Sequence, residues 1–200
     1  MKFPDNIKEI VGVKPDFLGL IFYPESKRFV TDSEAIVINE VIPESIKKVG
    51  VFVNADFDVI AAKLKLFNLN FVQLHGCETP ELCENLKNEG VIVIKAFGVG
   101  ESFDFAILKP YLQACDYFLF DTKSEKHGGT GIKFNWEILN NYKYDKPFFL
   151  SGGIGPDDAE GLKELNLGKL YSLDINSRFE TEPAKKDVNL LGNFISEYRK

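Results

Sequence analysis

The chain has 200 residues, 44% of them hydrophobic and 18 of them Phe, so a single domain over residues 1–200 can bury a sizeable core. Its formal net charge of −6 and pI near 5.1 argue against a nucleic-acid-binding surface, which needs clustered Lys and Arg. No apolar run reaches the roughly 18 residues of a membrane-spanning helix, and residues 1–5 contain no hydrophobic signal region.

The three cysteines, Cys77, Cys83 and Cys115, lack the spacing of a metal site. An odd number of thiols is typical of a reducing compartment. We therefore expect a cytoplasmic protein with no metal, and with neither nucleic acid nor membrane as a partner.

Strand-like and helix-like segments alternate along the chain. Helices are predicted at 4–11, after Thr31, at 56–67, from Thr79, at about 102–112, at 134–139, from Pro156 and at 188–198. Apolar or β-branched runs predict strands at 17–22, 48–53, 71–74, 91–95, 117–120, 148–151 and 170–175. Alternating units with apolar strands predict an α/β fold with a parallel sheet covered by helices.

The residues at the strand ends favour a closed barrel over an open doubly wound sheet. Nearly every strand is followed by a polar or glycine-rich group: Arg28, Asn54, His75, Asp121, Ser151-Gly152-Gly153 and Asp174. A site built from all the strand ends is typical of the TIM-type (βα)8 barrel, whereas an open sheet binds its ligand at one switch point. A barrel needs eight strands, and only seven are predicted here, so we expect the first strand to be absent from this chain.

Three loops predict phosphate recognition. Gly128-Gly129-Thr130-Gly131 and Ser151-Gly152-Gly153 each precede a predicted helix, and residues 174–177 follow the last strand. Backbone N–H groups at such places suit a phosphate, although glycine-rich turns are also common without one. In barrels a phosphate often lies between the loops after strands seven and eight, the positions that 151–153 and 174–177 take if one strand is absent.

Single polar residues allow two interpretations each. Asp121 could be a general acid or could brace the following loop. Arg28 could clamp a carboxylate or be solvated, and His75 could bind substrate or position a loop. Lys185-Lys186-Asp187 predicts a solvated face and a helix start.

Six segments together resemble the phosphoribosylanthranilate isomerases of tryptophan biosynthesis. They are FYPESKRFV (22–30), VGVFVN (49–54), FVQLHG (71–76), FDTKSEKHGGTGIKFNW (120–136), LSGGIGPDD (150–158) and LDINSRFETEPAKKD (173–187). The resemblance implies a small (βα)8 barrel without a cofactor, as a monomer or homodimer. Its substrate would be a small phosphorylated molecule, N-(5-phosphoribosyl)anthranilate. An Amadori rearrangement would convert it into 1-(2-carboxyphenylamino)-1-deoxyribulose 5-phosphate.

The resemblance also implies roles for individual residues. Asp121 would be the general acid, Arg28 would hold the anthranilate carboxylate with His75 nearby, and Asp174 would organise the phosphate corner. Donors to the phosphate would come from Gly129, Gly131, Gly152, Gly153, Asn176 and Ser177.

The sequence departs from the family pattern in three places. The family's base is a Cys at the end of the first strand, in a Lys-Ile-Cys-Gly motif, and that motif is absent, so we expect impaired activity and an opening one strand wide. Arg178 stands where a glycine is common, and Ala184 replaces a frequent glycine, which we expect to matter little.

Two other functions remain open. One is a non-catalytic barrel that binds a phosphorylated ligand. The other is an indole-3-glycerol-phosphate synthase, which is disfavoured because only Lys95 stands at a suitable strand end.

Overall fold

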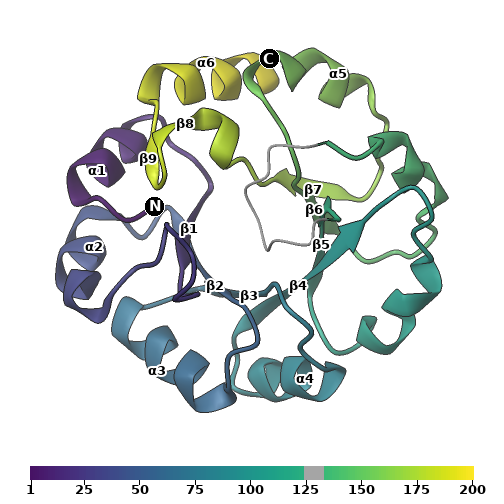
Figure 1. Cartoon of the computed structure of the whole chain (residues 1–200), viewed down its shortest axis with the longest axis horizontal. Coiled ribbons are helices and arrows are strands. Elements are labelled where there is room, and N and C mark those ends of the chain that lie inside the picture. The colour runs from purple at the N-terminus through teal and green to yellow at the C-terminus, as the bar shows by residue number, and fades with distance from the viewer. Residues whose placement is uncertain (124–132) are drawn as a thin grey trace.

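The computed structural model describes residues 1–123 and 133–200, and its centre is one curled parallel sheet. The strands are β1 (Phe17–Ile21), β2 (Lys47–Phe52), β3 (Phe71–Leu74), β4 (Ile92–Val99), β5 (Tyr117–Thr122), β6 (Phe148–Leu150) and β7 (Leu170–Leu173). Each pairs in parallel with the next, in the order β1-β2-β3-β4-β5-β6-β7. Figure 1 shows the strands curving around a central space, with helices on the outside. The seven predicted strands are confirmed.

Helical segments follow the strands as predicted, but not all of them are α-helices. The α-helices are α1 (Pro4–Gly12), α2 (Ala35–Val41), α3 (Phe57–Phe67), α4 (Pro80–Asn88), α5 (Ala159–Glu164) and α6 (Val188–Tyr198). The predicted helices at 102–112 and 134–139 are the 3₁₀ helices η2 (Phe105–Tyr111) and η3 (Trp136–Asn141). Pro110 lies inside η2 and has no N–H to donate, which disfavours a regular α-helix there. No helix of the described residues is long and apolar enough to cross a membrane.

The sheet is open between β1 and β7. Within the described part of the chain, neither strand has a partner strand on its second side, and residues 1–3 form no strand. The nitrogen of Met1 donates a hydrogen bond to the carbonyl oxygen of Gly19 in β1 at 2.8 Å. Side chains bridge the opening near the amino ends of the strands, where the Phe17 ring lies 6.2 Å from that of Tyr171. The architecture is the predicted TIM-type barrel with one strand position unfilled by the described strands.

The core has two parts because side chains of a strand alternate between its faces. Phe118 and Phe120 of β5 are fully buried against the surrounding helices, together with Phe52 and Phe67. Leu119 points the other way, into the barrel. The inner cluster consists of Val49, Phe71, Ile94, Ala96, Leu119 and Phe149.

A small antiparallel hairpin, absent from the predicted elements, lies between β7 and α6. Its strands are β8 (Glu180–Glu182) and β9 (Lys185–Lys186). Ala184 at its turn has φ +73°, in the left-handed region that glycine favours. Replacing the frequent glycine there therefore carries a backbone strain that the sequence did not indicate.

Candidate active site

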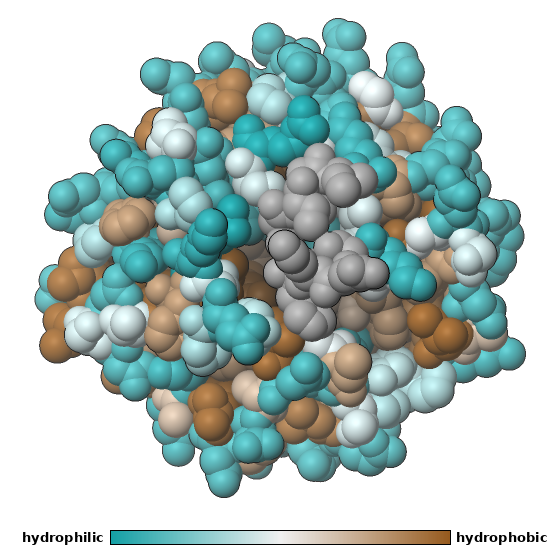
Figure 2. Space-filling view, in the orientation of Figure 1, coloured by the Kyte–Doolittle hydropathy of each residue, from teal (hydrophilic) through white to brown (hydrophobic). Residues whose placement is uncertain are grey.

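The predicted site residues meet in one cavity at the carboxyl ends of the strands. The cavity has a volume of about 640 Å³, and Figure 2 shows a hollow near the centre of this face with hydrophobic residues visible inside it. Its lining includes the predicted Arg28, His75, Asp121, Gly152, Gly153, Asp174, Asn176 and Ser177. Gly129 and Gly131 lie outside the described residues. The cavity also extends along the opening, between β1 and β7, to side chains of α5 and α6.

His75 and Asp121 lie close together across the cavity. His75 Nε2 lies 3.3 Å from Asp121 Oδ2, and both side chains are mostly buried. The amide nitrogen of Gln73 lies 2.9 Å from His75 Nδ1. As the Gln73 amide is oriented, its nitrogen donates, so Nδ1 accepts and the hydrogen of a neutral imidazole is on Nε2. His75 therefore presents its Nε2 to the Asp121 carboxyl group.

The chain can approach Asp121 closely at Gly152 because this residue has no side chain. Gly152 has φ +93°, and a Cβ there would lie 2.4 Å from Thr122 Oγ1 and 3.0 Å from Asp121 Oδ1. Gly153 also has a positive φ, of +68°. The glycines after β6 are thus needed for the backbone to pass beside Asp121.

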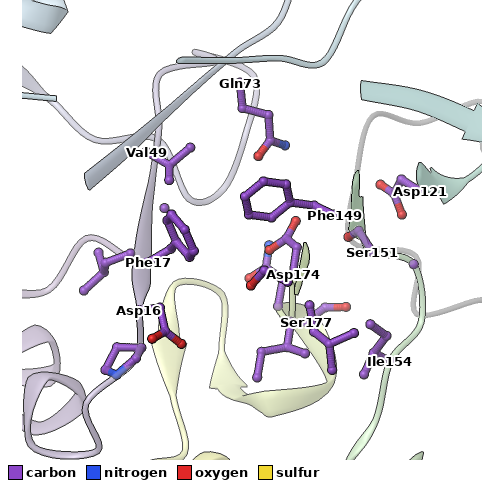
Figure 3. A pocket seen from close by; sticks show the side chains of 18 of the residues that line it. Asp16, Phe17, Val49, Gln73, Asp121, Phe149, Ser151, Ile154, Asp174 and Ser177 are labelled. Carbon is purple, nitrogen blue, oxygen red and sulfur yellow. The ribbon is translucent and has the colours of Figure 1, made fainter. Parts of the chain in front are cut away.

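Asp174 follows β7 and lines the cavity. Its backbone N–H donates to the carbonyl oxygen of Leu150 at 2.8 Å, which continues the β6–β7 ladder. In Figure 3 its side chain lies near the middle of the cavity, between Phe149 and Ser177. Burial, followed by the charge of Asp121, raises the pKa of Asp174 above its usual value.

Arg28 and Glu180 form a second charged group on the side of β1. Arg28 Nε lies 3.0 Å from each carboxylate oxygen of Glu180, and Nη2 lies 2.6 Å from Oε2. Burial opposes ionisation of Glu180, but the hydrogen bonds and charges of Arg28 and Lys186 outweigh it and hold its pKa below the usual value. Arg28 lines the cavity, and the Nε–Nη2 edge of its guanidinium is paired with Glu180.

Lys186 corrects one prediction, because it is buried rather than part of a solvated face. Its Nζ donates to Glu180 Oε1 at 3.1 Å and to the carbonyl oxygen of Asn176 at 2.8 Å, and it lines the cavity. Burial lowers its pKa, while Glu180 opposes that change. Neighbouring Asp187 does begin α6 as predicted, since its side chain accepts from Leu190 N–H. A lysine in a charged run gives no local signal of burial, which is why the sequence missed it.

The corner after β7 is formed by Asn176 and Ser177. Ser177 begins a 3₁₀ helix of three residues, Ser177–Phe179, and Lys186 lies against Asn176. Arg178 points out of the cavity lining toward Gly155, where a Cβ would lie 2.8 Å from Arg178 Nε. Lys186 brings a positive charge to the corner formed by Asn176.

No cysteine of the described residues lines the cavity. Cys77 is exposed, whereas Cys83 and Cys115 are fully buried, and burial raises the pKa of Cys83 to about 12 and that of Cys115 to about 11. The described residues also contain no group of three or more His, Cys, Asp and Glu placed to hold a metal ion. Lys95 is buried and does not line the cavity, which removes the one lysine considered for a synthase.

Comparison with known proteins decides the family. The model of the family described as N-(5'phosphoribosyl)anthranilate (PRA) isomerase matches residues 2–197. The chain belongs to this family. An N-(5'-phosphoribosyl)anthranilate isomerase of Parabacteroides distasonis is 42% identical over 201 residues, covering 98% of this chain and 90% of the relative. One of Phocaeicola vulgatus is 40% identical over 199 residues, covering 100% and 95%.

Solved structures of the PRA isomerase family share the fold. The phosphoribosyl anthranilate isomerase of Thermotoga maritima is 32% identical, with a TM-score of 0.88 over 100% of this chain and 95% of the other. A second phosphoribosyl anthranilate isomerase structure, 30% identical with a TM-score of 0.84 and the same coverage, contains reduced 1-(o-carboxyphenylamino)-1-deoxyribulose 5-phosphate. The predicted family and barrel fold are confirmed.

Proposed function

We propose that this chain acts as a phosphoribosylanthranilate isomerase in tryptophan biosynthesis. It would convert N-(5-phosphoribosyl)anthranilate into 1-(2-carboxyphenylamino)-1-deoxyribulose 5-phosphate. The observation that carries this proposal is the match of the family model to residues 2–197, because it covers the strand ends that supply His75, Asp121 and Asp174 to one cavity. A family member whose structure holds a reduced product analogue supports the substrate class.

Asp121 is proposed as the general acid. Its carboxyl group delivers a proton to the ribose ring oxygen as the bond from that oxygen to C1 breaks, which leaves a Schiff base to the anthranilate nitrogen. The carboxylate that remains lies 3.3 Å from His75 Nε2. His75 thus stabilises the charge that develops on the acid.

The substrate's two anionic groups are proposed to bind to Arg28 and to the loops after β6 and β7. Arg28 uses the edge of its guanidinium not paired with Glu180 to bind the anthranilate carboxylate. The phosphate takes backbone N–H groups of Gly152, Gly153 and Ser177, the Asn176 turn and the charge of Lys186, with Gly129 and Gly131 as further donors. Asp174 is proposed to organise the phosphate corner.

The second proton transfer, from C2, is the step for which the described residues supply no thiol. We propose that turnover by this chain is slow for that reason, by about 10²- to 10⁴-fold relative to the same barrel with a cysteine base. The same observation favours the alternative of a non-catalytic barrel that binds a phosphorylated ligand. That alternative predicts binding of the product without any turnover.

An assay with freshly prepared N-(5-phosphoribosyl)anthranilate tests the proposal. Product appearance is followed by chromatography, because substrate and product are isomers of equal mass, and Asp121→Asn serves as the control for spontaneous rearrangement. Turnover that depends on Asp121 supports the isomerase. Tight binding of the product with no turnover above the control supports the binding barrel.

The setting of the protein is also part of the proposal. We propose a cytoplasmic location, because tryptophan biosynthesis takes place there and the thiols are free. A monomer or a homodimer is proposed as the assembly, and a solved family member from Thermotoga maritima is described as dimeric.

A further inference from the structure

We propose that Glu78 and Lys95 are positioning residues that hold the end of β3, and thereby hold His75 in hydrogen-bonding distance of Asp121. Glu78 Oε2 lies 3.1 Å from Lys95 Nζ, and the two side chains are 1% and 3% exposed. Neither lines the cavity. The inference rests on the proposed role of the His75–Asp121 pair.

Lys95 binds the carbonyl groups on both sides of His75. Its Nζ donates to the carbonyl oxygen of Leu74 at 3.2 Å and to that of Gly76 at 2.8 Å. A third hydrogen bond, of 3.1 Å, goes to the carbonyl oxygen of Ala96 in β4. The lysine therefore ties the residues that flank His75 to the neighbouring strand, by bonds beyond the regular ladder.

Glu78 binds the N–H groups of the same turn. Its carboxylate accepts from Gly76 N–H at 2.9 and 3.0 Å and from Asn54 N–H, after β2, at 2.8 Å. The backbone carbonyl of Glu78 accepts from the hydroxyl of Tyr111 at 2.9 Å. The pair thus connects the end of β3 to β2, β4 and η2.

The turn has little room to move within this set of contacts. A Cβ at Gly76 would lie 2.3 Å from Asn54 Oδ1, and that same oxygen accepts from Cys77 N–H at 2.7 Å. The backbone N–H of His75 donates to the carbonyl oxygen of Phe52 at 2.8 Å. The backbone of His75 is consequently held by hydrogen bonds at His75 itself and at Gly76. The bonds at Gly76 are made to Glu78 and Lys95, and together these contacts fix where the imidazole starts.

A purely stabilising role makes a different prediction from a positioning role. Lys95→Met alone leaves the Glu78 carboxylate buried without its cation, which destabilises any protein whatever the pair does. The double variant Lys95→Met/Glu78→Gln removes both charges, while the Gln carbonyl oxygen can still accept one N–H. It recovers much of the stability but lacks the three hydrogen bonds from Lys95 to Leu74, Gly76 and Ala96.

The decisive measurement is nitrogen NMR of the histidine side chains, because the chain contains only two. The His75→Gln variant identifies the signals of His75 by their loss. In the parent we expect the ring-nitrogen shifts of a neutral imidazole protonated at Nε2. In the folded double variant we expect these shifts to move toward a mixture of tautomers, and kcat to fall about 10- to 100-fold with little change in KM.

Two further variants complete the test. Glu78→Gln alone is nearly isosteric and serves if the double variant does not fold. It weakens the acceptor of the Gly76 and Asn54 N–H groups but keeps the Lys95 hydrogen bonds, so we expect a smaller shift of the His75 signals in the same direction. Lys87→Met is the control, since Lys87 in α4 pairs with Asp116 at 3.4 Å and donates to the carbonyl oxygen of Gln113 at 3.0 Å. It should leave the His75 spectrum and kcat as in the parent.

Parent-like His75 shifts in a folded variant without the pair would overturn the proposal, and would assign Glu78 and Lys95 to stability alone. A change equal to that of Lys87→Met would do the same. The NMR result does not depend on turnover. If the parent proves to be a binding barrel, the proposed function fails while the positioning of His75 is still decided.

Discussion

His75 at the end of β3 and Asp121 at the end of β5 face each other over the end of β4, with 3.3 Å between Nε2 and Oδ2. Curvature of the sheet brings them together, because two strands separated by a third would be too far apart in a flat sheet. This contact joins the proposed acid to the residue proposed to stabilise the charge that develops on it.

Asp121→Asn is expected to lower kcat by about 10²- to 10⁴-fold, because an amide cannot deliver a proton to the ring oxygen. The variant should unfold at a temperature close to that of the parent. His75→Gln keeps a hydrogen-bond donor near Asp121, so its kcat should fall less than that of Asp121→Asn. Steady-state turnover with circular dichroism on the same samples checks both, and undiminished turnover by Asp121→Asn contradicts the assignment.

A strand-length segment ending in Cys-Gly, placed ahead of Met1, is expected to raise kcat by about 10²- to 10⁴-fold. Met1 lines the cavity, and its nitrogen lies against Gly19 of β1, so the added thiol would lie near the opening between β1 and β7. The matched control carries Ala in place of the added Cys. Equal kcat for the two extended proteins excludes a thiol base.

Asp174→Asn is expected to stabilise the fold at pH 7 while lowering substrate affinity. The raised pKa of Asp174, caused by burial and then by Asp121, means that its ionisation costs the folded state free energy. That cost is absent below the unfolded pKa of about 3.9 and grows as the pH rises through the higher folded pKa. Thermal unfolding should therefore show equal midpoints near pH 3.5 and a higher midpoint for the variant at pH 7. Equal midpoints at both values contradict this.

Lys14→Gly is expected to stabilise the protein by about 0.5–1 kcal/mol. Lys14 follows α1 with φ +54° and is exposed, so glycine removes a left-handed strain of about 1–2 kcal/mol, offset by its greater freedom in the unfolded chain. Lys8→Gly, within α1 and also exposed, is the control and should destabilise by about 1 kcal/mol. Urea unfolding measures both, and a loss of stability in Lys14→Gly contradicts the argument.

Only Cys77 is expected to react with a thiol reagent in the native protein at pH 8. Cys77 is exposed, whereas burial removes access to Cys83 and Cys115 and raises their pKa to about 12 and about 11. A colorimetric thiol titration should give one thiol per chain in buffer and three in denaturant. Cys77→Ser should abolish the native signal, and rapid reaction of a second thiol would falsify this account.

The sequence alone predicted much of the site, because the residues at strand ends follow their strands directly. Asp121 ends an apolar run and Asp174 ends another, and once the strands are parallel both must lie at the same edge. The Gly152-Gly153 turn was identified in the same way. The contacts of this turn could not be predicted, because the approach of Gly152 to Thr122 and Asp121 depends on how closely β5 and β6 pack.

The partners of buried charges could not be predicted from the sequence. Lys186 looked like a surface residue, yet it is buried against Glu180 and Asn176 through a hairpin that no sequence pattern indicated. Lys95 was considered as a catalytic lysine at a strand end, yet it is buried and paired with Glu78. Whether a charged side chain is buried or exposed depends on segments distant in the sequence, so the local sequence does not determine it.

The sequence by itself determined the order of strands and helices and the strand ends that carry Asp121 and Asp174, since these depend on local periodicity and short-range turn chemistry. It also predicted that one strand position would be open. The tertiary structure decided that His75 meets Asp121, that Arg28 is already paired with Glu180, and that Glu78 with Lys95 fixes the end of β3. Those contacts join residues far apart in the chain, and only the curvature of the sheet and the packing of its connections bring them together.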